Sequence, residues 1–175
     1  WCVVKKRGYV RTVIFLDTNI WINLLALKSS DKEYENLQIQ KASSFLKDNS
    51  EEIVSCREQQ IEIINAIQKI KRREFNRKLK QSGQKGIGSI KEFRKFKEFR
   101  DTVALCKSVY SDMQYLATID NNFSYNIENI IDNLSNIDIN DYMYLNYCVQ
   151  NKIKLYTFDQ ELFNSDISNN VVILL

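Results

Sequence analysis

Histidine is absent from the 175 residues, and its absence excludes several kinds of chemistry. Neither a Ser-His-Asp nor a Cys-His nucleophile system can be built, and no histidine can act as a general base. The cysteines include no Cys-x-x-Cys pair, so they do not indicate a zinc cluster, and we expect reduced thiols in the core. They are Cys2, Cys56, Cys106 and Cys148. Hydrolytic chemistry in this chain must therefore use carboxylates, lysines, tyrosines or a hard metal ion.

Proline is also absent, and there are only four glycines, of which Gly83, Gly86 and Gly88 predict one flexible loop. No apolar run approaches the roughly 20 residues that are needed to span a bilayer. The first residues, WCVVKKR, carry charge too early to form the apolar centre of a secretory signal. We therefore expect a soluble, cytoplasmic protein that has no membrane partner.

Positive charge is concentrated in one segment. The formal net charge is only +3, but residues 69–100 hold 13 Lys or Arg against three Glu, so the rest of the chain carries −7. An acidic body with a basic attachment suits a metal site and a polyanionic substrate. A solvated helical hairpin explains the same charges equally well.

Short apolar runs alternate with helical patterns along the chain. The length allows one domain, over residues 1–175, and is too short to expect two. We predict strands at residues 12–16, 52–55, 153–157 and 171–175. We predict helices at 20–27, 35–48, 55–79, 89–117, 126–134 and 141–150, with a break at 29–33. This alternation predicts an α/β three-layer sandwich with a mainly parallel central sheet and a basic helical segment at 69–100.

Four acids fall at positions that this plan brings together. Asp17 and Asp159 follow the carboxyl ends of two predicted strands, Asp141 begins a helix, and Glu62 lies about two turns into another. In an open parallel sheet, the residues just beyond the strand ends converge on one crevice. Taken singly, Asp17 and Asp141 could be helix caps, Glu62 a solvent-facing residue and Asp159 a turn residue.

Clustered carboxylates repel each other unless a cation neutralises them. Ligation by oxygen alone suits Mg²⁺ or Mn²⁺, with waters completing the coordination shell. Such an ion can activate a water and stabilise the charge that develops during phosphodiester hydrolysis. The joint placement of the acids therefore predicts a metal-dependent hydrolytic site.

Four sequence blocks resemble those of PIN-domain nucleases, in the same order and with similar spacing. They are residues 15–22 (FLDTNIWI), 53–64 with QQIEII at its end, 141–148 (DYMYLNYC) and 156–159 (YTFD). Four features depart from the family pattern. Cys148 replaces a usual small residue, residues 151–152 lack the usual glycine, and the second block has a looser register. Glu58 is therefore a weaker alternative to Glu62, and Asp138 is an alternative to Asp141 that breaks the spacing. The basic segment with its glycine loop is longer than a compact toxin requires, which is typical of a substrate arm, a partner-binding hairpin or a different PIN subfamily.

The resemblance implies a PIN-like fold and a ribonuclease that depends on Mg²⁺ or Mn²⁺, commonly the toxin of a VapC-type toxin–antitoxin pair. It implies RNA as substrate, an antitoxin protein as a further partner, and homodimerisation. Carried over by position, Asp17, Glu62, Asp141 and Asp159 would be catalytic and hold the metal. Asn19 would brace Asp17 or its loop, and Thr157 would orient Asp159 or a substrate phosphate.

The leading hypothesis is therefore an endoribonuclease. An alternative is a catalytically weak PIN-fold module that binds RNA or a protein through the same basic segment. A carboxylate-dependent phosphatase is the third interpretation, although Asn19 stands where the second acid of an Asp-x-Asp arrangement is expected.

Overall fold

The structure is a computed structural model that describes residues 12–25, 33–165 and 170–175. Cys2 lies outside these ranges. So does the break predicted at residues 29–33, except for Glu33. Cys56, Cys106 and Cys148 are free thiols, and the first and last of them are buried. Among the described helices, none is long and apolar enough to cross a membrane.

Five parallel strands form the central sheet, in the order β3-β2-β1-β4-β5. They are β1 (Val13–Leu16), β2 (Glu52–Cys56), β3 (Thr118–Asp120), β4 (Lys154–Thr157) and β5 (Val172–Leu174). In the middle of the sheet, Phe15 pairs with Val54 on one side and with Leu155 on the other. The predicted parallel α/β architecture is thus confirmed, and every strand pair in the described chain is parallel.

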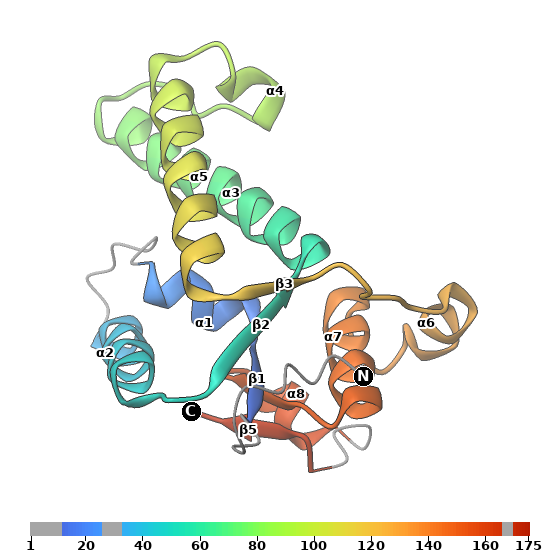
Figure 1. The fold of residues 1–175 in the computed structure, drawn as a ribbon. Helices are drawn as coiled ribbons and strands as arrows, with labels where there is room; N and C mark the ends of the chain where they lie inside the picture. The colour runs from blue at the N-terminus through green and yellow to red at the C-terminus, as the bar shows by residue number, and fades with distance from the viewer. Residues whose placement is uncertain (1–11, 26–32, 166–169) are drawn as a thin grey trace.

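Helices cover both faces of the sheet (Figure 1). They are α1 (Thr18–Leu24), α2 (Glu33–Asp48), α3 (Arg57–Gln81), α4 (Ile90–Phe93), α5 (Lys97–Leu116), α6 (Ile127–Asn133), α7 (Ile139–Asn151) and α8 (Gln160–Asn164). Helices α1, α2, α3 and α5 pack on one face, and α6, α7 and α8 pack on the other. These are the three layers that the sequence predicts.

Two cores result because successive strand side chains point to opposite faces of the sheet. On β1, Ile14 and Leu16 join the core beneath α1 and α3, whereas Phe15 joins the core beneath α7. All three side chains are fully buried. This is why the first strand has a continuous apolar run instead of an alternating pattern.

A buried polar side chain ties the start of α3 to the end of β1. Gln59 is fully buried, and its Nε2 donates to the carbonyl oxygen of Leu16 at 2.7 Å. Its Oε1 accepts from the Ser55 hydroxyl at 2.7 Å. Because Leu16 directly precedes Asp17, this pair of hydrogen bonds fixes the first turn of α3 next to the first predicted site residue.

One predicted helix was wrong, and two short elements were missed. The single helix predicted over residues 89–117 is broken after α4, and the break lets Phe93 and Phe99 pack edge to face with their ring centroids 5.6 Å apart. The ring of Phe75 on α3 closes this cluster at 5.3 Å from that of Phe93. The missed elements are β3 and α8, which have only three and five residues and so show no periodicity.

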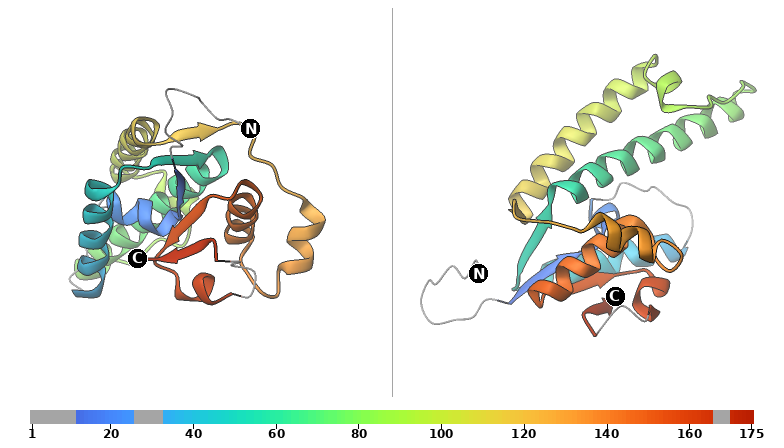
Figure 2. Two further views of the ribbon diagram at one scale, coloured as in Figure 1. Left: turned by 60° about the horizontal axis from the view of Figure 1, so that its bottom comes forward. Right: turned by 90° about the vertical axis from the view of Figure 1, so that its right-hand side faces the viewer.

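The basic segment forms the outer part of a helical hairpin. Helix α3 has 25 residues, which corresponds to a length of about 37 Å. Its side chains up to Ile70 pack on the body, and beyond this point the hairpin packs on itself through the cluster around Phe75 and Phe93. The hairpin therefore projects from the sheet, as the right-hand view of Figure 2 shows.

Candidate metal centre

Asp17 lies at the carboxyl end of the central strand β1. Its backbone N–H donates to the carbonyl oxygen of Tyr156 at 2.9 Å, which holds it beside the end of β4. Asp17 is the N-cap residue of α1, but its side chain makes no capping hydrogen bond. Instead, one carboxylate oxygen accepts a 2.6 Å hydrogen bond from the hydroxyl of Thr157. The side chain is 5% exposed, so the carboxylate lies in the interior and does not cap the helix.

Burial raises the pKa of Asp17 from 3.8 to about 6. The hydrogen bonds from the Thr157 hydroxyl and the Thr18 backbone act in the opposite direction, and the charges of Glu62 and Asp159 raise the pKa further. A buried carboxylate near two other acids is costly when ionised, and a cation would offset that cost.

Glu62 approaches the same place from the second turn of α3. One of its carboxylate oxygens accepts from the hydroxyl of Thr18 at 2.9 Å and from that of Tyr144 at 2.7 Å. Its charge raises the pKa of both Asp17 and Asp141. The alternative, Glu58, instead lies near Cys56, where burial raises the pKa of the thiol and the charge of Glu58 raises it further.

Tyr144 is a member of the site that sequence reasoning missed. It is 1% exposed on α7, and burial together with the charge of Glu62 raises the pKa of its hydroxyl far above the ordinary value. The hydroxyl therefore stays protonated and donates to Glu62. The sequence places Tyr144 three residues after Asp141 and so on the same face of the helix, but it does not show that the hydroxyl reaches Glu62.

Asp141 lies in the first turn of α7, whose N-cap residue is Asp138. The Asp141 side chain is partly buried, and the pKa of its carboxyl rises from 3.8 to about 7. Burial is the largest cause, followed by the charges of Asp17, Asp159, Glu62 and, last, Asp138. The four predicted acids therefore lie within one another's electrostatic reach.

Asp159 has a capping role as well. It is the N-cap residue of α8, and its Oδ1 accepts from the backbone N–H groups of Glu161 at 2.7 Å and Leu162 at 3.1 Å. The interpretation of Asp159 as a turn residue thus has direct geometric support. Its charge still reaches the site, because it raises the pKa of Asp17 and of Asp141.

The hydroxyl of Thr157 is the centre of the polar network. It donates to Asp17 and accepts from the side-chain amide of Asn19 at 3.1 Å and the backbone N–H of Asp159 at 2.8 Å. The Oδ1 of Asn19 accepts in turn from the backbone N–H of Phe158 at 3.2 Å. Asn19 thus braces the loop after β4, and Thr157 orients Asp17 as well as the backbone of Asp159.

We expect Thr157→Val to weaken the binding of Mn²⁺ by about 10–100-fold, the usual cost of removing a partner that orients a metal ligand. Valine has nearly the same shape but leaves the buried Asp17 oxygen without its donor, which also raises the pKa of Asp17 further. Isothermal titration with Mn²⁺ measures the change. Thr157→Ser, which keeps the hydroxyl, is the matched control, and native affinity in the valine variant would show that this network does not support ligation.

The donor set of this site suits a hard cation. All four acids offer oxygen, and the pKa values of Asp17 and Asp141 are raised, first by burial and then by the charges of the neighbouring acids. Over the described ranges, no three Asp, Glu or Cys side chains are gathered closely enough to hold a metal ion by themselves. Mg²⁺ fits such a site, because it usually keeps several waters and is bound by one or two carboxylates.

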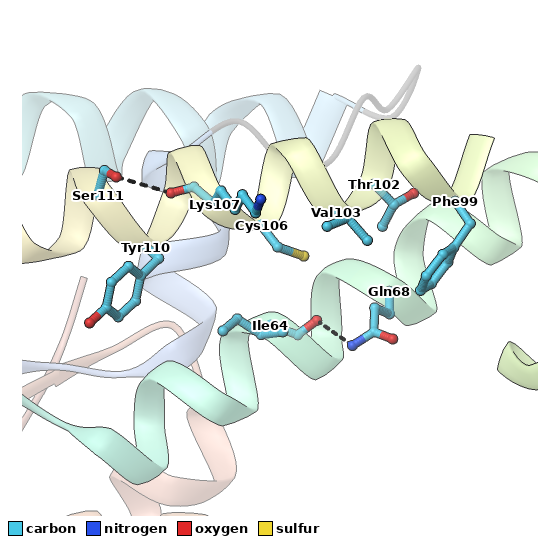
Figure 3. A pocket seen from close by; sticks show the side chains of 9 residues that line it. All are labelled: Ile64, Gln68, Phe99, Thr102, Val103, Cys106, Lys107, Tyr110 and Ser111. Atoms are coloured by element: carbon cyan, nitrogen blue, oxygen red, sulfur yellow. Dashed lines mark hydrogen bonds between the residues drawn. The ribbon is translucent and has the colours of Figure 1, made fainter. Parts of the chain in front are cut away.

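A separate cavity of about 480 Å³ opens between α3 and α5 (Figure 3). Its lining includes Ile64, Phe99, Val103 and Cys106, and none of the four acids. It therefore lies on the hairpin and is not the place where the carboxylates meet.

The fold and the site together define an α/β protein with an acidic centre at the carboxyl edge of its sheet, an arrangement suited to cation-assisted chemistry on polyanions. The chain belongs to the PIN domain family, whose model matches residues 14–166. PIN domains are generally nucleases that act on RNA or DNA, usually with divalent metals, and the family supports a hydrolase of nucleic acids. No curated protein matches the sequence.

Proposed function

We propose that this protein is an endoribonuclease that depends on Mg²⁺ or Mn²⁺. The observation that carries the proposal is the buried Asp17 carboxylate, which is held by Thr157 and has a pKa raised by burial and by two neighbouring acids. An enzyme keeps a carboxylate in so unfavourable a place when it has work for that charge. Membership of a family whose members are generally nucleases supports phosphodiester hydrolysis as the role of that charge.

Asp17 and Asp141 would hold the cation, with Glu62 and Asp159 contributing charge or water-mediated contacts. When bound, the cation would supply an activated water and neutralise charge on the scissile phosphate. Thr18 and Tyr144 hold Glu62 in place with two hydrogen bonds to one of its oxygens. Thr157 and Asn19 keep the end of β4 against Asp17. Each of these residues acts before the chemistry, by fixing where the acids point.

RNA is the proposed substrate because the four sequence blocks resemble those of PIN-domain ribonucleases. The same resemblance supports a cytoplasmic toxin that is paired with an antitoxin and forms a homodimer. These finer assignments are predictions from the sequence motifs. An antitoxin would be sought as a protein that copurifies with the chain and inhibits its activity.

Cleavage of a fluorescently labelled RNA under Mg²⁺, under Mn²⁺ and under EDTA tests the proposal. We expect cleavage with either ion, none with EDTA, and products that carry a 5′-phosphate. Asp141→Asn should reduce cleavage strongly, whereas Asp138→Asn, which changes an exposed acid one helical turn away, should not. Undiminished cleavage in EDTA, or equal effects of the two substitutions, would count against the proposed centre.

A catalytically weak RNA-binding module is the second candidate. It is favoured by the basic segment at residues 69–100, which can bind RNA whether or not the acids hold a metal. RNA binding without Mn²⁺ binding or cleavage, measured by titration calorimetry and the same cleavage assay, would support this alternative.

A further inference from the structure

The outer part of the hairpin carries a dense and unpaired positive charge. We call residues 69–100 the basic arm. Of its 13 Lys and Arg side chains, 11 are exposed. The one ion pair found between described residues joins Lys71 to Glu74, at 2.8 Å. The arm therefore presents cations that no carboxylate of the described chain neutralises.

One row of these cations continues the helix face that carries Glu62. Lys69, Arg73, Arg77 and Lys80 follow Glu62 at intervals of seven, four, four and three residues on α3. Because residues three, four or seven apart lie on one face of a helix, these side chains form a single stripe. All four cations are exposed. We call them the α3 stripe.

The stripe leads away from the acidic centre over a considerable distance. From Glu62 to Lys80 is 18 residues, or about 27 Å along the helix axis. Helix α3 starts directly after β2, at the sheet edge where Asp17 and Thr157 lie, and then projects from the body (Figure 2). A nucleic acid with one phosphate at the acidic centre could thus follow the stripe outward.

The loop of the arm is held by specific hydrogen bonds. The Asn76 side chain donates to the carbonyl oxygen of Ile87 at 2.9 Å and accepts from its N–H at 2.8 Å. A Cβ atom at Gly86 would come within 3.2 Å of the Asn76 Oδ1, so glycine lets the loop lie close to α3. Arg72 donates to the carbonyl oxygen of Gly88. These hydrogen bonds therefore hold the loop of the basic arm against α3.

The aromatic residues of the basic arm pack against one another inside the hairpin. Phe75 is 7% and Phe93 is 1% exposed, Phe99 is half-buried, and only Phe96 is exposed. Proteins that hold single-stranded nucleic acids usually combine positive charge with exposed aromatic rings on which bases stack. An arm that offers mainly cations instead suits the regularly spaced phosphates of a duplex.

We propose that the α3 stripe binds the phosphate backbone of a double-stranded RNA segment and so selects stem-containing RNAs. The inference rests on the proposed function, because the acidic centre supplies the cleavage. A span of about 27 Å corresponds to roughly ten base-pair steps, because an A-form RNA duplex rises about 2.8 Å per step. The stem would therefore extend about ten base pairs from the scissile bond. The alternative ligand of the α3 stripe is an acidic protein segment.

The test compares the native chain with the triple variant Arg73→Gln/Arg77→Gln/Lys80→Gln. The matched control, Lys41→Gln/Lys47→Gln/Lys152→Gln, removes three exposed charges from the body. Fluorescence anisotropy in EDTA, where metal-dependent cleavage is blocked, measures binding of a stem-loop RNA with about twelve base pairs. An oligouridylate of equal length is the unpaired probe, and circular dichroism checks that each variant is folded.

We expect the stripe variant to bind the stem-loop at least about tenfold more weakly. The slope of the logarithm of the binding constant against the logarithm of the salt concentration should become shallower by about two to three, because each lost phosphate contact reduces it by about 0.9. The control variant should bind like the native chain, and oligouridylate binding should change little. Unchanged stem-loop binding would overturn the inference, as would an equal loss in the control variant or with oligouridylate. Stripe-dependent binding of polyglutamate, with RNA binding unaffected, would overturn it in favour of an acidic protein.

The two proposals can fail separately. Stripe-dependent stem-loop binding by a chain that cleaves no RNA under Mg²⁺ or Mn²⁺ would uphold the role of the arm and overturn the proposed endoribonuclease. Metal-dependent cleavage by a chain whose stem-loop binding does not depend on the stripe would uphold the proposed endoribonuclease and overturn the role of the arm.

Discussion

Asp17→Asn is expected to lose essentially all RNA cleavage while the protein stays folded. Asparagine keeps the size of the side chain and can still accept the hydrogen bond from Thr157. It removes the negative charge that would hold a divalent cation at the centre. The loss should exceed the roughly 10–100-fold that follows from removing a residue that only orients a ligand. Single-turnover cleavage of labelled RNA under saturating Mn²⁺ measures it.

Asp101→Asn is the control for this substitution, because Asp101 is an exposed acid on α5 and outside the centre. The control should cleave like the native chain. Titration calorimetry should show weaker Mn²⁺ binding in Asp17→Asn alone. Native cleavage by Asp17→Asn would mean that this buried carboxylate has no role in the reaction.

The second large effect concerns pH and stability. Without metal, the free energy of unfolding should fall as the pH rises from about 4 to about 7. In that interval the folded chain holds protons on Asp17 and Asp141, whose pKa values are about 6 and about 7, whereas the unfolded chain has released them near 3.8. The folded state therefore binds more protons, and raising the pH favours the unfolded state. The shift of Asp17 alone corresponds to about 3 kcal/mol.

A cation should reverse this loss. At pH 8 both carboxylates are ionised, so Mn²⁺ meets two charged ligands and should raise the unfolding temperature clearly. At pH 5 protons occupy the same groups and compete with the ion, so the rise should be small. Thermal unfolding at both pH values, with and without Mn²⁺, measures the difference. Asp17→Asn should flatten the pH dependence of the apo protein, and an equally steep dependence in that variant would assign it to other groups.

The sequence was sufficient to predict four of the five strands, because most of their residues are buried or partly buried. Four of the five strands have apolar runs that no helix pattern interrupts, and the parallel order follows from the helices between them. The positions of Asp17 and Glu62 could be predicted for the same reason. Asp17 directly follows β1, and Glu62 lies in the helix that directly follows β2. The register of such a sheet brings residues that are 140 positions apart, Asp17 and Thr157, into hydrogen-bond contact.

Features that depend on tertiary packing could not be read from local patterns. The spacing of apolar residues continues across Phe93, Phe96 and Phe99, yet the chain turns there. Phe93 and Phe96 pack against Phe75, and Phe99 packs against Phe93. Likewise, Tyr144 has the pattern of a core residue, and only the structure brings its hydroxyl to Glu62. A helix pattern identifies the buried face but not the polar atom at the end of a buried side chain.

The short strands at the two ends of the sheet limit how copies of this chain can associate. In the described part of the chain, the sheet ends at β3 and at β5, and each has only three residues. An outer strand of that length offers few free backbone groups, so it is a poor template for joining two sheets into one continuous sheet. Self-association would instead have to use helical surfaces. A homodimer could thus form or separate without changing the hydrogen bonds that align β1 and β4 around Asp17.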